Sequence, residues 1–221
     1  QGECLGIVGE SGSGKSTLAN IIMNLEKADS GTVLLNNKDI TNIKSNKLKE
    51  IYKDIQMVFQ DAIGSFNPRF TIEESIMEYV CNLCSTTEAD KKHKVDNLLR
   101  MVGLSKEYKY RYPHELSGGQ CQRAAIARAL SAQPKILVCD EATSALDVSV
   151  QAQIVELLKE MQEKMNISYL FITHDLALVS SFCDRVAVMK NGKIVEVGDT
   201  KEVINNPKDE YTKLLIKSAY F

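Results

Sequence analysis

The residues from Gly9 to Thr17 combine the groups that hold a nucleoside triphosphate: backbone N–H donors, an amino group and hydroxyls. This phosphate loop reads Gly9-Glu-Ser-Gly-Ser-Gly-Lys-Ser16-Thr17 and follows the apolar run Leu5-Gly-Ile-Val8. Its glycines permit positive φ, and the helix expected from Thr17 to Leu25 turns its positive dipole end to the same place. We predict phosphate contacts from Gly9, Ser11, Gly12, Ser13, Gly14, Lys15, Ser16 and Thr17.

Lys15 and Ser16 have the most specific expected roles. Lys15 would reach the β- and γ-phosphates as a point charge, and the Ser16 hydroxyl would ligate the Mg²⁺ that accompanies the nucleotide. A glycine-rich turn that merely connects a strand to a helix is the alternative interpretation. The strand before the segment and the helix after it favour phosphate binding.

A second chemical pattern is the pair of carboxylates at the end of Lys135-Ile-Leu-Val-Cys-Asp140-Glu141. The continuous apolar run is typical of a parallel strand buried on both faces, and ligands of such sheets collect at the carboxyl ends of strands. We therefore expect Asp140 to hold Mg²⁺ and Glu141 to act as general base or to position water at the γ-phosphate. A strand that ends in two solvated acids is the plainer alternative.

Length and composition indicate a soluble globular protein. The 221 residues, 44% hydrophobic and 25% charged, can bury one substantial core or a core with a subdomain. A net charge of −2 and a pI near 6.0 give no general reason to expect nucleic acid as a partner. No apolar run approaches the roughly 18 residues that cross a bilayer, and no signal sequence opens the chain, so we expect a cytoplasmic location.

The cysteines and isolated histidines indicate no metal site. Several of the six cysteines lie inside apolar patterns, and we interpret them as reduced core thiols. Cys81-Asn-Leu-Cys84 has the spacing of half a zinc site, but no second pair follows at a zinc-site distance. His93 and His114 lack such companions, and we expect them on the surface.

Apolar strands that alternate with helices predict a wound α/β core. The expected strands are 4–8, 32–35, 55–59, 136–139, 169–172 and 185–189, and the last joins 193–197 through a type I′ turn at Asn191-Gly192. Between Gln60 and Leu130 the residue pattern is instead typical of helices. Thr71 and Glu74 predict a capping box before a helix that extends to Leu83, and another helix is expected from Glu88 to Val102.

Leu116-Ser-Gly-Gly-Gln120, here named the signature segment, resembles the signature of the ATP-binding cassette (ABC) ATPases. The helix Cys121–Leu130 follows it, so its backbone donors form a second anion site at a helix N-terminus. A glycine-containing helix N-cap that binds no ligand is the alternative. It explains the helix but not why this segment occurs in the same chain as a phosphate loop. The resemblance implies that Ser117, Gly118, Gly119 and Gln120 bind the ATP held by a partner subunit.

Further motifs extend the resemblance over essentially the whole chain. Gln60 matches the family's Q-loop glutamine, which contacts Mg²⁺ or the attacking water. Ser144-Ala-Leu-Asp147 matches the D-loop, which implies that Asp147 lies at the dimer interface beside the nucleotide. His174 matches the switch histidine near the γ-phosphate and is expected to be catalytic, although taken alone it would be interpreted as a structural strand-end residue.

The resemblance implies a single ABC ATPase domain over 1–221 with a P-loop NTPase fold. Residues 1–60 and 134–221 would form the RecA-like core, and 61–133 an inserted helical subdomain. Family members stack adenine on an aromatic residue in strands before the phosphate loop. Because only eight residues precede Gly9, we expect those N-terminal strands to be missing from this sequence.

Three weaker segments narrow the resemblance to importers of oligopeptides, dipeptides and nickel: Phe66-Asn-Pro-Arg69, 171–189, and Asn206-Pro207 before Tyr211-Thr-Lys-Leu-Leu215. Asn-Pro-Arg is also an ordinary turn, and the tail helix from about Asp209 is also explained by plain packing. The resemblance implies ATP and Mg²⁺ as cofactors. It implies as partners a second ATPase subunit, membrane permease subunits and, indirectly, an extracytoplasmic binding protein, with this chain on the inner face of the membrane.

Other functions remain open at this level. An ABC-type accessory subunit of a soluble complex, such as one for phosphonate breakdown, would share every motif. A DNA-repair or translation ABC protein would need a coiled-coil insertion or a second cassette, and a nucleotide kinase would leave the signature segment unexplained.

Overall fold

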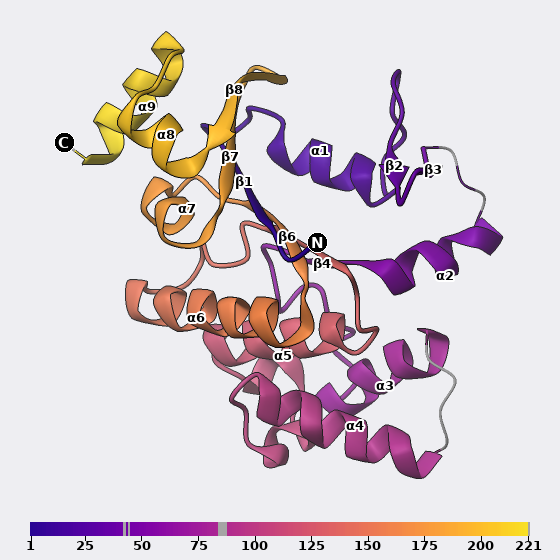
Figure 1. Ribbon diagram of the computed structural model, residues 1–221. Coiled ribbons are helices and arrows are strands. Elements are labelled where there is room, and N and C mark those ends of the chain that lie inside the picture. The colour runs from indigo at the N-terminus through magenta and orange to yellow at the C-terminus, as the bar shows by residue number, and fades with distance from the viewer. Residues whose placement is uncertain (42, 44, 84–87, 221) are drawn as a thin grey trace. The chain divides into compact units, whose positions relative to one another are not determined.

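The computed structural model describes residues 1–41, 43, 45–83 and 88–220, and the polypeptide forms two compact units (Figure 1). Unit 1 comprises Gln1–Ile43, Val138–Glu141 and Lys159–Phe221, and unit 2 comprises Lys44–Leu137 and Ala142–Leu158. Cys84, half of the Cys81/Cys84 pair, lies outside the described residues. In the described part of the chain, no helix is long and apolar enough to span a membrane.

Unit 1 is built around a mainly parallel sheet. Its elements are β1 (Cys4–Val8), α1 (Lys15–Ile22), β2 (Leu34–Leu35), β3 (Lys38–Asp39), β6 (Ser168–Ile172), α7 (Leu176–Phe182), β7 (Arg185–Lys190), β8 (Lys193–Asp199), α8 (Thr200–Asn205) and α9 (Glu210–Tyr220). The strand β5 (Ile136–Asp140) begins in unit 2 and ends in unit 1, and α6 (Val148–Met165) likewise passes from unit 2 into unit 1.

The strand order in unit 1 is β5-β6-β1-β7-β8. The central strand β1 runs parallel to β6 and to β7, whereas β7 and β8 form an antiparallel hairpin. Asn191 and Gly192 at its turn both have positive φ, 47° and 76°, which confirms the predicted type I′ turn.

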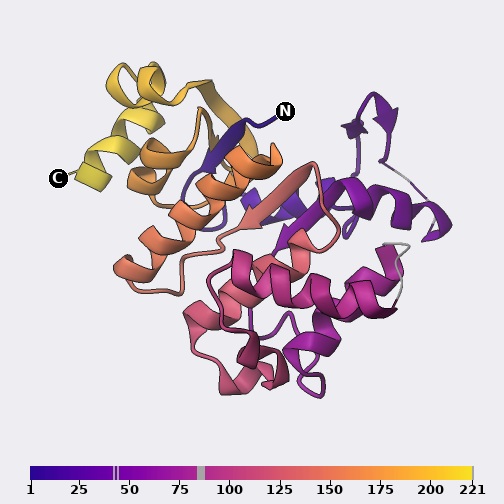
Figure 2. The same cartoon turned by 60° about the horizontal axis from the view of Figure 1, so that its bottom comes forward.

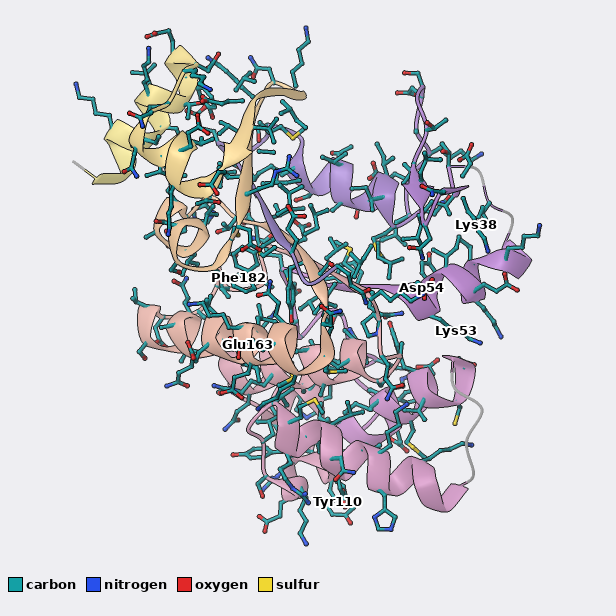
Figure 3. The ribbon with its side chains drawn as sticks, in the orientation of Figure 1. Lys38, Lys53, Asp54, Tyr110, Glu163 and Phe182 are labelled. Carbon is teal, nitrogen blue, oxygen red and sulfur yellow. The ribbon has the colours of Figure 1, made fainter. Side chains whose placement is uncertain are left out.

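Burial explains why these segments form strands. Cys4, Ile7 and Val8 of β1 are at most 3% exposed, as expected for a parallel strand covered on both faces. Phe182, labelled in Figure 3 near the end of α7, packs edge-on against Tyr169 and Phe171 of β6 with ring centroids 5.3 Å apart. The apolar runs of the sequence therefore become the core under the carboxyl ends of β1 and β6.

Unit 2 is mostly helical, as Figure 2 shows from a second direction. Its further elements are α2 (Ser45–Asp54), β4 (Ile55–Val58), α3 (Ile72–Leu83), α4 (Glu88–Met101), the 3₁₀ segments η1 (Lys106–Tyr110) and η2 (Pro113–Glu115), and α5 (Gly118–Leu130). The amide of Thr71 donates to Glu74 Oε2 at 2.7 Å and the amide of Glu74 to Thr71 Oγ1 at 3.2 Å, which confirms the predicted capping box.

The thiols follow the prediction with one correction. Cys4, Cys121, Cys139 and Cys183 are free and buried, but Cys81 is exposed and is not a core thiol. Its position on the solvent side of α3, a helix with only one buried face, accounts for the difference. His93 and His114 are exposed as expected.

Candidate functional site

The phosphate loop connects β1 to α1, as the sequence predicts. Gly14 is the N-cap of α1 and has a left-handed backbone with φ of 101°, which glycine adopts without strain. The helix begins at Lys15, two residues before the predicted start, and ends at Ile22. Ser11, Gly12, Ser16 and Thr17 are exposed along this loop, whereas Ser13 is buried.

Lys15 is a buried cation at the centre of the loop, with only 4% of its surface exposed. Its Nζ donates to the carbonyl oxygens of Gly9 at 2.8 Å and Glu10 at 2.9 Å, with Ser13 Oγ at 3.5 Å. None of these three acceptors carries a formal charge. A buried ammonium held by uncharged oxygens is suited to an incoming anion, which would supply the countercharge.

The hairpin of β7 and β8 packs against the loop. A Cβ placed on Gly9 would lie 2.1 Å from the carbonyl oxygen of Met189, so only glycine fits there. The amide of Gly192 donates to the carbonyl oxygen of Ser13 at 2.9 Å. The shape of the loop is therefore fixed by residues about 180 positions away in the sequence.

Asp140 at the end of β5 meets the start of α1. Ser16 Oγ donates to Asp140 Oδ1 at 3.0 Å, and Asp140 is only 8% exposed. Burial raises the pKa of Asp140, although the Ser16 hydrogen bond and the Lys15 charge act against that shift. The pair offers a hydroxyl and a carboxylate oxygen, which are ligands that Mg²⁺ prefers.

Glu141 follows Asp140 with a left-handed backbone, φ of 46°. Its amide donates to the carbonyl oxygen of Ile172 at 2.9 Å, which brings it to the end of β6. His174, two residues beyond β6, has Nδ1 3.7 Å from Glu141 Oε1. A non-glycine residue in this backbone region is costly, and such strain is found preferentially at functional sites.

Unit 2 carries the remaining predicted residues. The exposed Gln60 follows β4, and its Nε2 donates to Ser144 Oγ at 3.4 Å. Ser117 is the N-cap of α5: its Oγ accepts from the Gln120 amide at 3.3 Å, and Gln120 Oε1 accepts from the Ser117 amide at 3.0 Å. Asp147 caps α6 through the Val150 amide at 3.0 Å.

The signature segment and the D-loop are neighbours within unit 2. A Cβ on Gly118 would lie 3.4 Å from Leu146 Cδ2, and one on Gly119 would lie 2.7 Å from Val150 Cγ1. The structure thus gathers the phosphate loop, Asp140, Glu141 and His174 in unit 1, and gathers Gln60, Asp147 and the signature segment in unit 2. The roles of all these residues, and the 61–133 subdomain, stay predictions.

Two polar contacts near the predicted residues have no local signal in the sequence. The hydroxyl of Tyr211 in α9 accepts a hydrogen bond from the Glu10 amide at 3.1 Å. In unit 2 the buried Arg128 of α5 donates to Ser65 O at 2.7 Å and to Ser65 Oγ at 2.8 Å, and it lies 4.1 Å from the centre of the Phe66 ring. The importer resemblance had singled out the segments that contain Tyr211 and Phe66, but not the contacts that these residues make.

A sheet whose β1 strand leads through a glycine-rich loop into a helix defines the class of phosphate-loop NTPases. The protein-family model described as ABC transporter matches residues 1–144. The chain therefore belongs to the ABC transporter family.

Curated relatives match nearly the whole chain. The oligopeptide transport ATP-binding protein OppF of Salmonella typhimurium is 48% identical, and the dipeptide transport ATP-binding protein DppF of Lactococcus lactis subsp. cremoris is 46% identical. Both alignments cover 99% of this chain, but only 66% of OppF and 71% of DppF. The chain thus spans about two thirds of the length of these relatives.

A solved structure confirms the α/β fold. The ATP-binding cassette MJ0796, in a dimeric post-hydrolysis state bound to ADP and Pi, superposes with a TM-score of 0.81 at 32% sequence identity. The match covers 90% of this chain and 86% of that one.

Proposed function

We propose that this chain binds ATP with Mg²⁺ and hydrolyses the ATP, as the ATP-binding subunit of a membrane importer for peptides. The observation that carries the proposal is the buried Lys15, whose ammonium group donates to the uncharged carbonyl oxygens of Gly9 and Glu10 inside a glycine-rich loop at a helix N-terminus. That arrangement is completed by a triphosphate. The names of OppF and DppF support ATP and favour peptides over nickel as the cargo.

Mg²⁺ fits the residues that meet at the end of β5. Asp140 and Ser16 would hold the ion, with Gln60 as the third predicted contributor, and the ion would neutralise charge on the phosphates. The described residues include no group of three His, Cys, Asp or Glu side chains that could hold a metal. A site of this kind therefore depends on the oxygens of the nucleotide, as is usual for Mg²⁺.

The hydrolysis step is assigned to Glu141 and His174. Glu141 would accept a proton from the attacking water while the oxygen of that water bonds to the γ-phosphorus. The bond between the γ-phosphorus and the β–γ bridging oxygen would break at the same time, which gives ADP and phosphate. His174 would contact the γ-phosphate and orient Glu141, and its Nδ1, 3.7 Å from Glu141 Oε1, supports this role. Lys15 and the amides of the phosphate loop hold the phosphates in place throughout.

The partners follow from the signature segment. We assign Ser117, Gly118, Gly119 and Gln120 to the ATP on a second ATPase subunit, with Asp147 at the same interface. The dimeric state of MJ0796 supports this assignment. The assembly would contact permease subunits at the inner face of the membrane and, through them, an extracytoplasmic binding protein.

The direct test is Glu141→Gln, which keeps the shape of the side chain and removes the base. We expect ATP turnover to fall at least about 100-fold while ATP affinity stays within about twofold. Glu163→Gln on α6 is the matched control, since Glu163 is an exposed glutamate of unit 1 (Figure 3) and should leave turnover unchanged. Unchanged turnover in Glu141→Gln would refute the assignment of the base.

The dimer is tested with the same variant. Because Glu141→Gln should retain ATP, its mass in solution with Mg²⁺ and ATP is expected to rise from 24.6 kDa to about twice that value. Adding Ser117→Arg, which places a bulky cation on the exposed signature segment, should abolish the dimer. Dimers that persist with Ser117→Arg would count against the assigned interface.

A further inference from the structure

The last helix of the chain contacts the phosphate loop through one hydroxyl group. Tyr211, in the first turn of α9, is 6% exposed. Its hydroxyl oxygen accepts a hydrogen bond from the Glu10 amide at 3.1 Å, across 201 residues of sequence. The Tyr211-Thr-Lys-Leu-Leu215 segment thus acquires a partner that neither helix packing nor the function proposed above explains.

The bonded amide belongs to the same peptide unit that holds Lys15. The carbonyl of Gly9 and the N–H of Glu10 lie in one planar group and point to opposite sides of it. On one side, Gly9 O accepts from Lys15 Nζ at 2.8 Å, and on the other, the Glu10 N–H donates to Tyr211. The hydroxyl of Tyr211 therefore fixes the orientation of the plane whose carbonyl positions the Lys15 ammonium.

Tyr211 is itself held in place by charged groups. Lys190 Nζ lies 4.5 Å from the centre of the Tyr211 ring. The backbone amide of Tyr211 donates to Asp209 Oδ1 at 2.8 Å. The carboxylate of Glu196 in β8 accepts from the amides of Lys208 at 2.9 Å and Asp209 at 3.0 Å. These bonds fasten the start of α9 beside β8, the arrangement visible at the yellow end of the chain in Figure 1.

Plain packing of α9 would need the ring of Tyr211 but not its hydroxyl. On the basis of the function proposed above, we infer that Tyr211 is a positioning residue for nucleotide binding, which acts through the Gly9–Glu10 peptide on Lys15. The hydroxyl keeps the loop in the shape that accepts the β- and γ-phosphates. Without it, part of the binding free energy would be used to order the loop.

The test uses Tyr211→Phe in the 221-residue chain, which deletes the hydroxyl and keeps the ring. We expect the affinities for ADP and for ATP, each measured calorimetrically with Mg²⁺, to fall about three- to tenfold, the value of one lost hydrogen bond. In steady-state assays KM should rise by a similar factor while turnover at saturating ATP stays within about twofold. Tyr169→Phe is the matched control: it removes a buried hydroxyl at the opposite end of the parallel strands and should leave both affinities unchanged.

A double-mutant cycle with Lys15→Ala separates positioning from general stabilisation. If Tyr211 acts through Lys15, adding Tyr211→Phe to Lys15→Ala should weaken ADP binding by less than about twofold. An equal three- to tenfold loss in both backgrounds would overturn the route through Lys15. Unchanged affinity in the single variant would overturn the inference as a whole.

The failure of this inference is distinct from failure of the proposed function. If Lys15→Ala binds ATP as tightly as the parent chain, the phosphate-loop assignment fails and this inference fails with it. If Lys15→Ala loses affinity while Tyr211→Phe does not, the nucleotide site stands and only the role of Tyr211 is wrong.

Discussion

The phosphate loop of unit 1 and the signature segment of unit 2 are both glycine-containing turns that open a helix, but they are held in different ways. The loop is fixed by distant parts of the chain: Met189 and Gly192 of the β7–β8 hairpin, and Tyr211 of α9. The signature segment is held over much shorter sequence distances, by the reciprocal hydrogen bonds of Ser117 and Gln120 and by the bond that Gln120 Nε2 donates to the Tyr108 hydroxyl at 2.9 Å.

This difference is consistent with the proposed dimer, in which each ATP site is made of two half-sites: the phosphate loop of one subunit and the signature segment of the other. The phosphate loop encloses a buried cation, Lys15, and the contacts that shape it come from unit 1. It therefore has the features of a binding site that needs only the nucleotide. The signature segment is exposed at Ser117 and Gly118, and among the described residues its anchoring bonds leave that face open. A binding site of this kind and an exposed donor surface on one polypeptide are what a head-to-tail pair requires.

The largest expected difference is between Gly9 of the phosphate loop and Gly118 of the signature segment, in the cost of adding a methyl group. Gly9→Ala places Cβ 2.1 Å from the backbone oxygen of Met189, so we expect the free energy of unfolding to fall by about 3 kcal/mol. Gly118→Ala meets only Leu146 at 3.4 Å and should change it by less than about 0.5 kcal/mol. Chemical denaturation of both variants without nucleotide measures this, and equal losses would contradict the distinction.

The second largest expected difference is between the two buried cations, Arg128 of unit 2 and Lys15 of unit 1, in what each contributes to the free energy of unfolding. Arg128 donates to Ser65 and lies over the Phe66 ring, so Arg128→Met should lower the free energy of unfolding by about 2 kcal/mol. Lys15→Met should leave it unchanged or raise it, because the desolvated ammonium is retained for ligand binding. Denaturation curves without nucleotide decide the matter, and a Lys15→Met variant less stable than Arg128→Met would show that Lys15 is structural.

The smallest expected effect concerns the attachment of α9. Partial burial alone would raise the pKa of Glu196, but the hydrogen bonds that it receives from the segment before α9 outweigh this and lower it. Because the pKa is lowered, the ionised carboxylate stabilises the fold at pH values above 4.5, the ordinary pKa of a glutamate. This stabilisation is lost as the pH falls through the pKa of the folded state.

Glu196→Gln should therefore lower the melting temperature at pH 7, and the gap from the parent should close as the pH drops below 4.5. Thermal melts across this range without nucleotide provide the measurement. Glu210→Gln, which removes a carboxylate from an exposed ion pair on α9, is the control and should show almost no gap. If the difference in melting temperature between the parent chain and Glu196→Gln widens on acidification, the lowered pKa of Glu196 is contradicted.

Local chemistry made much of the structure predictable from sequence. The strand before Gly9, the capping box at Thr71 and the turn at Asn191-Gly192 depend on residues a few positions apart, and all three are confirmed. The helix α2 was not predicted, because most of its residues between Ser45 and Asp54 are polar and its apolar stripe is narrow.

Contacts between distant segments could not be predicted in the same way. The bond from Glu10 to Tyr211 spans 201 residues, and the approach of Met189 to Gly9 depends on the pairing of β7 with β1. Such contacts follow from sheet topology, which no short pattern encodes. The strained backbone of Glu141 likewise leaves no mark on the sequence, although its carboxylate could be chosen as a site residue from its position after β5.

Mixing two inactive variants tests most directly whether each ATP site combines a phosphate loop with a partner's signature segment. Lys15→Ala lacks a working loop and Ser117→Arg lacks a working signature segment, so each alone should hydrolyse ATP at least about 100-fold more slowly than the parent chain. A mixed dimer of the two retains one intact pair of half-sites, and equimolar mixing is predicted to restore a substantial part of the ATPase activity. A mixture no more active than its components, or a Ser117→Arg protein that is fully active alone, would contradict the shared site.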